Sequence, residues 1–359
     1  MDLLRAVAII QVIAVHLGHL YVTPSGWLAA LIVSHWNDGV TLFFVISGFV
    51  ITRTIMLREP DIYRMSLRAF YARRIARVQP LLLASIALGA VMLAIGFIGE
   101  PFRGAQHPPF DTAFWLTLVT CTFNWLRVTA MTHTGALAEW GLHWNVMWTL
   151  AIEEQFYLLL PITLILAGSR ARFLKLLGAV ILICMTLHLL SLRFFMSMVY
   201  SSFSGFDGLG VGVLIGLVAP ACTTALARYA MAGGLLVITE AMLTPESLLH
   251  PIQIIIGAAM FILGAQKLDH VFGRAWQAPA RIGSLSYEAY LLHPLALALI
   301  APAFRSYALG FGPALLLAVV YVVALAYTVE TFFTRPANTQ LRRVLLSSTN
   351  PKLALNLSG

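Results

Sequence analysis

The chain has 359 residues, of which 60% are hydrophobic and 11% are charged, and its mean hydropathy is +0.85. This composition excludes a soluble globular protein and predicts an all-α, polytopic integral membrane protein. The net charge of +8 does not indicate a nucleic-acid partner, because nucleic-acid binding requires a basic face on a soluble domain and no such domain is expected.

Ten apolar segments predict about ten transmembrane helices, since each approaches the length that a helix needs to cross a bilayer. In chain order they cover residues 3–21, 39–57, 78–98, 146–168, 174–195, 207–222, 229–244, 252–267, 283–303 and 312–332. The sequence has no internal repeat and no linker long enough to hold a second domain. We therefore expect one transmembrane domain over residues 1–335 and a short cytoplasmic tail over residues 336–359.

The first segment carries two ionisable side chains, Arg5 and His16, on one face of the predicted helix. Their separation of eleven positions makes about three helical turns and rises about 16 Å, which places His16 past the middle of the bilayer. Ionisable groups at that depth are costly and indicate a candidate functional site. His16 either acts as a general base in a partly dry cavity or donates a structural hydrogen bond to a neighbouring helix.

The second segment contains the run GVTLFFVISGF over residues 39–49, in which Ser47 and Gly48 interrupt large apolar side chains. Small residues let a neighbouring helix or a slender ligand approach the backbone closely. Both interpretations fit this run.

Seven arginines follow the second segment and extend into the start of the third: Arg53, Arg58, Arg64, Arg68, Arg73, Arg74 and Arg77. Stretches this rich in arginine lie on the cytoplasmic side of a membrane. Arg74 and Arg77 are three residues apart, and with Arg73 they form a fork that suits phosphate groups. Anionic head groups of membrane lipids would explain the same arginines.

The basic residues of the other loops predict that both termini are cytoplasmic and that the helix starting near residue 146 enters from the outer side. Because the helix that starts at residue 78 also ends outside, the segment near residues 111–127 cannot make one full crossing between them. We expect this segment to be re-entrant or to lie along the outer surface.

The run WNVMWTLAIEEQFYLLLP over residues 144–161 places two adjacent carboxylates, Glu153 and Glu154, inside a predicted span. Tyr157 follows Glu153 by four residues and shares its face. A carboxylate in such surroundings either orients a histidine or forms an ion pair with an arginine. A purely structural ion pair is the competing interpretation.

Other polar or sulfur-containing residues give weaker signals. Asp207, Tyr287, His293 and Glu330 are each explained by a packing hydrogen bond. The three cysteines lie in apolar surroundings without metal-ligand spacing, so we expect neither a disulfide framework nor a bound metal; they are Cys121, Cys184 and Cys222.

Six motifs, in this order, resemble the membrane acyltransferase-3 family nearly from end to end. They are RAVAIIQVIAVH, LFFVISGF, FYARRIARVQP, WTLAIEEQFYLLLP, FDGLGVGVLIG and IGSLSYEAYLLHP. The resemblance implies transfer of an acyl group, often acetyl, from cytoplasmic acyl-CoA to a hydroxyl of an extracytoplasmic saccharide or lipid-linked acceptor. It also implies a multi-pass protein of the inner (plasma) membrane that needs no bound cofactor, acyl-CoA being a substrate.

The resemblance further implies roles for individual residues. His16, Glu153 and Arg5 would be catalytic, and Arg73, Arg74 and Arg77 would bind the donor. Four other residues would line the site: Ser47, Trp148, Tyr157 and Asp207. The chain departs from the family pattern at several positions, which leaves the acceptor open: Thr41, Thr149, Gln79 and Gly205.

Two other classes of function compete with acyl transfer. A transporter or exporter of a polar or glycolipid substrate would use the same buried charges as a translocation path. A sensor or assembly subunit would need no acyl donor. A transporter would move its substrate without changing it, so the chemistry of the product separates these classes.

Overall fold

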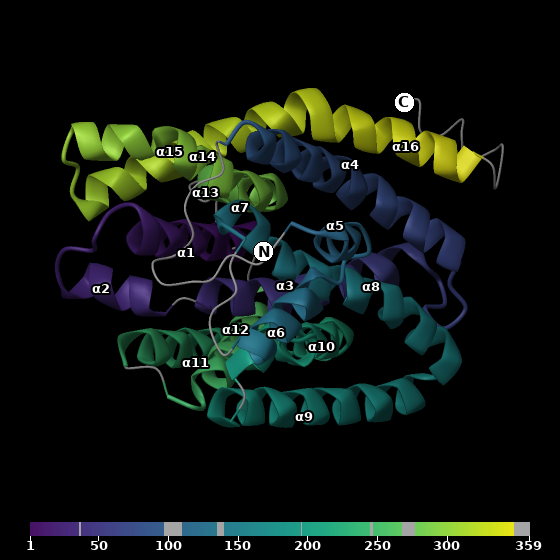
Figure 1. Cartoon of the computed structure of the whole chain (residues 1–359). Coiled ribbons are helices and arrows are strands. Elements are labelled where there is room, and N and C mark those ends of the chain that lie inside the picture. Colours follow the sequence, from purple (N-terminus) through teal and green to yellow (C-terminus); the bar gives the residue numbers. More distant parts are fainter. Residues whose placement is uncertain are drawn as a thin grey trace.

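The computed structural model describes residues 1–35, 37–96, 110–134, 140–194, 196–244, 247–267 and 277–347. Within these residues the chain forms helices and no β-strand (Figure 1). The α-helices are α1 (Asp2–Leu20), α2 (Trp27–Ser34), α3 (Asp38–Arg58), α4 (Leu67–Ala94), α5 (Thr112–Val119), α6 (Phe123–Thr134), α7 (Leu142–Asn145), α8 (Met147–Ala167), α9 (Arg170–Phe194), α10 (Phe203–Val218), α11 (Thr224–Leu243), α12 (His250–Ala265), α13 (Gln277–Ser284), α14 (Ser286–Ser306), α15 (Phe311–Val329) and α16 (Arg335–Ser347).

Nine helical stretches of the described chain are long and apolar enough to cross a membrane, which confirms the prediction of an all-α polytopic membrane protein. They contain α1, α3, α4, α7 with α8, α9, α10, α11, α14, and α15 with α16. The tenth predicted span, residues 252–267, corresponds to α12. Its 16 residues rise about 24 Å, which is short of a hydrocarbon core about 30 Å thick.

The helices pack around α3, which lies along α10 and also contacts α1, α8 and α12. In Figure 1, α9 covers one side of the bundle, and α4 and α16 run together along the opposite side. A π-helical turn over Glu330–Thr334 joins α15 to α16. Helix α3 therefore lies at the centre of the bundle, and α16 continues α15 along α4.

Two glycines let α3 and α10 meet backbone to backbone. A Cβ atom on Gly48 would collide with the carbonyl group of Leu209, and one on Gly212 would collide with the carbonyl oxygen of Val45. Close helix packing is therefore the correct interpretation of Gly48. Its neighbour Ser47 points instead toward a cavity.

We expect Gly48→Ala to lower the free energy of unfolding by about 1–3 kcal/mol, because the added methyl group forces the two backbones apart. Thermal unfolding of the purified protein in detergent would measure the loss. Gly178→Ala in α9 is the matched control, since no atom lies within 4 Å of the added Cβ and alanine favours a helix. Equal losses in the two variants would contradict the close α3–α10 contact.

Helix α4 begins at Leu67, well before the predicted span at residue 78. Ser66 caps it, because its side-chain oxygen accepts a hydrogen bond from the backbone nitrogen of Ala69 at 3.2 Å. As a result, Arg73, Arg74 and Arg77 project from the early turns of one long helix. Because they belong to one helix, the relative positions of their backbones are fixed.

The segment near residues 111–127 forms two short helices, α5 and α6. The chain breaks between them at Cys121, which has a φ of 53°. Neither α5, with 8 residues, nor α6, with 12 residues, is long enough to cross a bilayer. This agrees with the prediction of a re-entrant or surface segment.

Helices α2 and α16 lie outside the predicted spans. The eight residues of α2 are too few for a transmembrane signal. Helix α16 falls within the predicted tail, where arginines and polar residues lower the hydropathy, and it packs against α4. Residues 348–359 of that tail lie outside the described residues.

Candidate functional site

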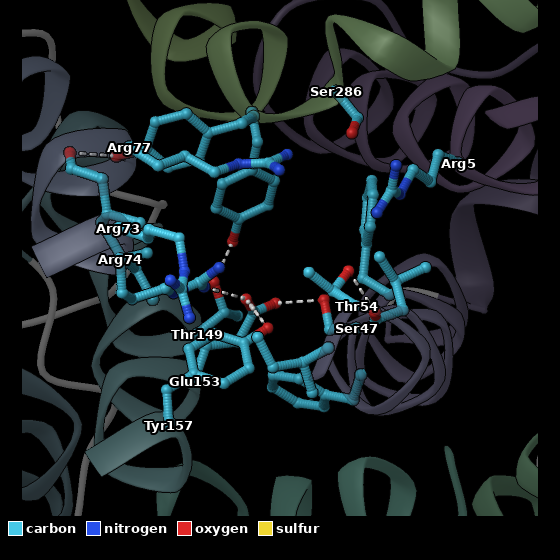
Figure 2. A pocket seen from close by; sticks show the side chains of 18 of the residues that line it. Arg5, Ser47, Thr54, Arg73, Arg74, Arg77, Thr149, Glu153, Tyr157 and Ser286 are labelled. Carbon is cyan, nitrogen blue, oxygen red and sulfur yellow. Dashed lines mark hydrogen bonds and ion pairs between the residues drawn. The ribbon is translucent and has the colours of Figure 1, made fainter. Parts of the chain in front are cut away.

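A cavity of about 240 Å³ lies where α3, α4, α8, α14 and α16 meet the start of α1. Its lining carries six arginines and one carboxylate: Arg5, Arg58, Arg73, Arg74, Arg77, Arg342 and Glu153. Figure 2 shows the α4 arginines on one side of the cavity and Arg5 on the other. The fold thus brings the three predicted donor-binding arginines together with two of the predicted catalytic residues, Arg5 and Glu153.

Arg74 lies between the two adjacent carboxylates of α8. Its guanidinium group is 3.8 Å from Glu153 Oε2 and 3.3 Å from Glu154 Oε1, and it covers the ring of Tyr157 at 3.6 Å. The three charged side chains are only 15–19% exposed. Of the alternatives that the sequence left open for the carboxylates, an ion pair with arginine is the one that forms.

Glu153 also binds two hydroxyl groups. Ser47 donates a hydrogen bond to Oε1 at 3.2 Å, and Tyr157 donates one to Oε2 at 3.0 Å (Figure 2). These bonds and the Arg74 charge favour the ionised carboxylate despite its burial. Glu153 therefore joins α3, α4 and α8 at one wall of the cavity.

Positive charge remains in excess around the cavity. Arg73 pairs with Glu59 at 2.9 Å, and Arg5 pairs with Asp2 at 3.0 Å. Three more lining arginines have no ion pair within the described part of the chain: Arg58, Arg77 and Arg342. Unpaired guanidinium groups that converge on a cavity suit a ligand with several phosphate oxygens.

His16 does not line this cavity but lies against His293 of α14. The two rings stack with centroids 5.0 Å apart, and His293 Nε2 is 3.1 Å from His16 Nδ1. His293 Nδ1 donates to the carbonyl oxygen of Tyr290 at 2.7 Å, so Nε2 of the neutral ring accepts the proton of His16 Nδ1. His16 Nε2 is then left with its lone pair, which is the state that a general base requires.

Tyr290 connects this histidine pair to the cavity. It lines the cavity together with Thr149, and its hydroxyl accepts a hydrogen bond from Thr149 Oγ1 at 2.7 Å. The same hydroxyl donates to the carbonyl oxygen of Val146 at 3.1 Å. One helix, α14, thus supplies both the neighbour of His16 and part of the cavity wall.

Besides His16, two predicted site residues do not line the cavity, Trp148 and Asp207. Trp148 is buried and packs edge-on against Phe44, which does line the cavity, and against Tyr200. Asp207 lies elsewhere, with its Oδ2 2.6 Å from Nδ1 of the buried His188. Its hydrogen bond to His188 explains why this carboxylate is tolerated inside α10.

Four residues of the arrangement carried little or no signal in the sequence. Arg58 was explained by topology alone, and His293 by packing. Tyr290 lies less than one helical turn before His293. The sequence does not show that this spacing links the cavity to the histidine pair, because that link depends on the contact between His293 and His16. Arg342 belongs to the predicted tail, and only the packing of α16 against α4 brings it to the cavity.

Comparisons with known proteins identify the family of the chain. A family model described as an acyltransferase domain matches residues 1–330. Over 147 residues the chain is 34% identical to an uncharacterised protein of Haemophilus influenzae, and the match covers 40% of this chain and 55% of that protein. Over 162 residues it is 29% identical to the peptidoglycan O-acetyltransferase of Listeria monocytogenes, covering 45% of this chain and 23% of that protein. The aligned part is thus little more than half of the first relative and less than a quarter of the second, and no solved structure gives a significant match.

Proposed function

Because the chain belongs to the membrane acyltransferase-3 family, we propose that it is an O-acyltransferase of the inner (plasma) membrane. It transfers an acyl group, preferably acetyl, from cytoplasmic acyl-CoA to a hydroxyl of an extracytoplasmic saccharide or glycolipid. The observation that carries the proposal is the arginine-lined cavity, whose α14 wall continues to the His16–His293 pair. A saccharide acceptor also suits the peptidoglycan named for the Listeria relative.

The donor side of the proposal rests on charge. The arginines of α3, α4 and α16 gather at one end of the bundle, which the distribution of basic residues assigns to the cytoplasm. CoA carries a diphosphate and a separate phosphate, so several guanidinium groups are needed to hold it. Arg58, Arg77 and Arg342 bind these phosphates, whereas Arg73 and Arg74 hold the cavity in shape through their carboxylate partners.

The transfer step rests on His16. Nε2 takes the proton of the acceptor hydroxyl while its oxygen forms a bond to the acyl carbon. The bond from that carbon to the CoA sulfur breaks, and the released thiolate takes up the proton that His16 Nε2 had accepted, which regenerates the base. His293 holds the His16 ring in the required tautomer. Arg5, which lines the cavity below His16 on the same helix, supports the bound donor.

Mass spectrometry of envelope glycans from cells with and without this protein tests the function. We expect one sugar to lose the mass of an acetyl or longer acyl group when the protein is absent. Purified protein in proteoliposomes should release CoA only when donor and acceptor are both present. An acceptor that crosses the membrane without gaining an acyl group would contradict the proposal and favour a transporter.

We expect Arg77→Ala to raise the KM for acyl-CoA about 10-fold and to change kcat little, because it removes a charge-assisted contact to the donor. Donor titrations in isolated membranes would measure this. Arg64→Ala is the control, since the Arg64 side chain is 88% exposed and lies outside the cavity. An unchanged KM for acyl-CoA in Arg77→Ala would contradict donor binding by this arginine and would mean that it serves only to orient the protein in the membrane.

A further inference from the structure

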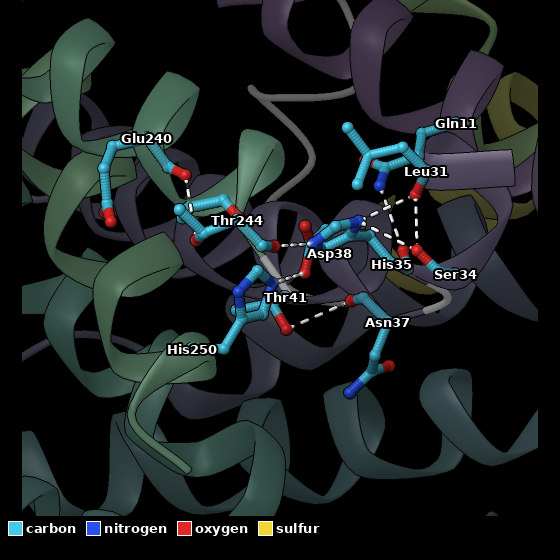
Figure 3. A network of polar contacts seen from close by, with 11 residues as sticks. Gln11, Leu31, Ser34, His35, Asn37, Asp38, Thr41, Glu240, Thr244 and His250 are labelled. Atoms are coloured by element: carbon cyan, nitrogen blue, oxygen red, sulfur yellow. Dashed lines mark hydrogen bonds and ion pairs between the residues drawn. The ribbon is translucent and has the colours of Figure 1, made fainter. Parts of the chain in front are cut away.

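A second polar cluster lies at the end of α3 opposite Arg58. It consists of His35, which follows α2, Asp38 at the start of α3, and His250 at the start of α12 (Figure 3). The three residues are 1%, 4% and 4% exposed. One nitrogen or oxygen atom of each lies within 4.8 Å of the other two. None of these residues belongs to the arginine-lined cavity.

The two imidazole rings of this cluster carry fewer N–H protons than their hydrogen-bond contacts require. His35 Nδ1 is 2.7 Å from the carbonyl oxygen of Leu31, and His35 Nε2 is 3.0 Å from that of Thr244. His250 Nε2 is 2.7 Å from Asp38 Oδ1. Each of the three contacts needs a proton on nitrogen, but two neutral imidazoles carry only two. At least one lone pair therefore faces an oxygen unless a cation is present.

Within the described ranges, neighbouring groups do not supply the missing proton. The hydroxyl of Ser34, which is 3.4 Å from His35 Nδ1, donates instead to the carbonyl oxygen of Leu31 at 2.8 Å. Asp38 Oδ2 is buried and has no hydrogen-bond donor among the described residues. No arginine or lysine there pairs with this carboxylate either. A buried carboxylate without a full cationic partner is costly.

We propose that His35, Asp38 and His250 bind a divalent transition-metal ion, with zinc as the best match. Two imidazoles and one carboxylate are a ligand set typical of zinc, whereas magnesium and calcium prefer oxygen ligands alone. The carbonyl oxygen of Thr244 is placed to supply a further ligand. Zinc ligands at about 2.0–2.1 Å lie about 3.4 Å apart, so the three side chains need only small movements from their positions within 4.8 Å of one another.

The hydrogen bonds around the cluster fit metal binding. With its Nδ1 proton on the Leu31 carbonyl, His35 presents the Nε2 lone pair to the ion. Gln11 of α1 donates to the carbonyl oxygen of His35 at 3.1 Å and holds the loop before α3 in place. The ion would join that loop to α12 and to Thr244 at the end of α11. Its role is therefore to fasten the α11–α12 hairpin to α1 and α3.

Zinc binding by the full-length protein tests the proposal. The protein is purified without a histidine tag, treated with EDTA, and titrated with Zn²⁺, and bound metal is counted by elemental mass spectrometry. We expect about one ion per chain and a higher unfolding temperature when zinc is added. His250→Gln and Asp38→Asn should each weaken zinc binding by about 100-fold or more.

His188→Gln is the matched control, because His188 is also a buried imidazole beside a carboxylate but has no third metal ligand in the described part of the chain. It should keep the wild-type zinc stoichiometry. Zinc binding that survives in His250→Gln and Asp38→Asn would mean adventitious surface binding and would overturn the proposal. Wild-type protein that binds no zinc would do the same, whether or not the variants fold. Acyl transfer is not part of the readout, so this result does not depend on the proposed function.

Discussion

Replacing His16 with alanine is expected to lower the rate of acyl transfer by about 10²–10⁴-fold, the contribution of a general base. The physical reason is that His16 Nε2 holds the lone pair that His293 leaves available. Turnover of a labelled acetyl donor in proteoliposomes would measure the loss. Insertion should stay intact, since one side chain changes in an apolar helix, and protease accessibility of the loops would verify it.

Two comparisons make this result specific to the proposed chemistry. His133→Ala, which removes an exposed histidine of α6, should leave transfer unchanged. His293→Gln keeps an acceptor oxygen for the His16 proton, so it should retain more activity than His293→Leu. Transfer at a near-normal rate in His16→Ala would refute the catalytic role, and equal activity in the two His293 variants would refute the positioning role.

Arg74→Ala is expected to lower the free energy of unfolding by about 3–5 kcal/mol, the cost of leaving a buried charge without its partner. The loss follows from Glu153 and Glu154, which would remain side by side and only 15–19% exposed. Denaturant or thermal unfolding in detergent would measure it. The amount of protein recovered from membranes should fall as well.

Removing one carboxylate charge together with the Arg74 charge should restore much of the lost free energy of unfolding. Arg74→Met combined with Glu154→Gln removes one buried charge of each sign, so the double variant should be more stable than Arg74→Met alone. Arg335→Ala is the surface control, because the Arg335–Glu330 pair at 2.9 Å has an arginine that is 67% exposed and contributes little. A loss of similar size in Arg335→Ala and Arg74→Ala would contradict a special role for the buried cluster.

The sequence predicted the spans well because length and hydropathy alone determine them. That Arg5, Ser47, the α4 arginines and Glu153 belong to one site was implied by the resemblance to the family and not by their spacing. The sequence could not predict which arginine would meet Glu153, since that depends on how α4 and α8 cross. Asp207 shows the same limit, because its partner His188 lies on a neighbouring helix.

Contacts between distant parts of the chain account for the rest. Arg342 reaches the cavity only because the last helix continues into the predicted tail and packs against α4. His35 and His250 are more than 200 residues apart, and no spacing rule links them. The expectation of no bound metal rested on cysteine spacing, which carries no information about a ligand set assembled from three helix ends.

The glycine contact between α3 and α10 limits which wall of the cavity can move. Because the two backbones touch at Gly48 and Gly212, α3 cannot slide or rotate without a backbone collision, and the wall that bears Ser47 stays still. The opposite wall consists of α4 and α16, which lie at the edge of the bundle (Figure 1). We therefore expect any widening of the cavity to be an outward movement of that helix pair, in which the arginines of α4 and α16 move together.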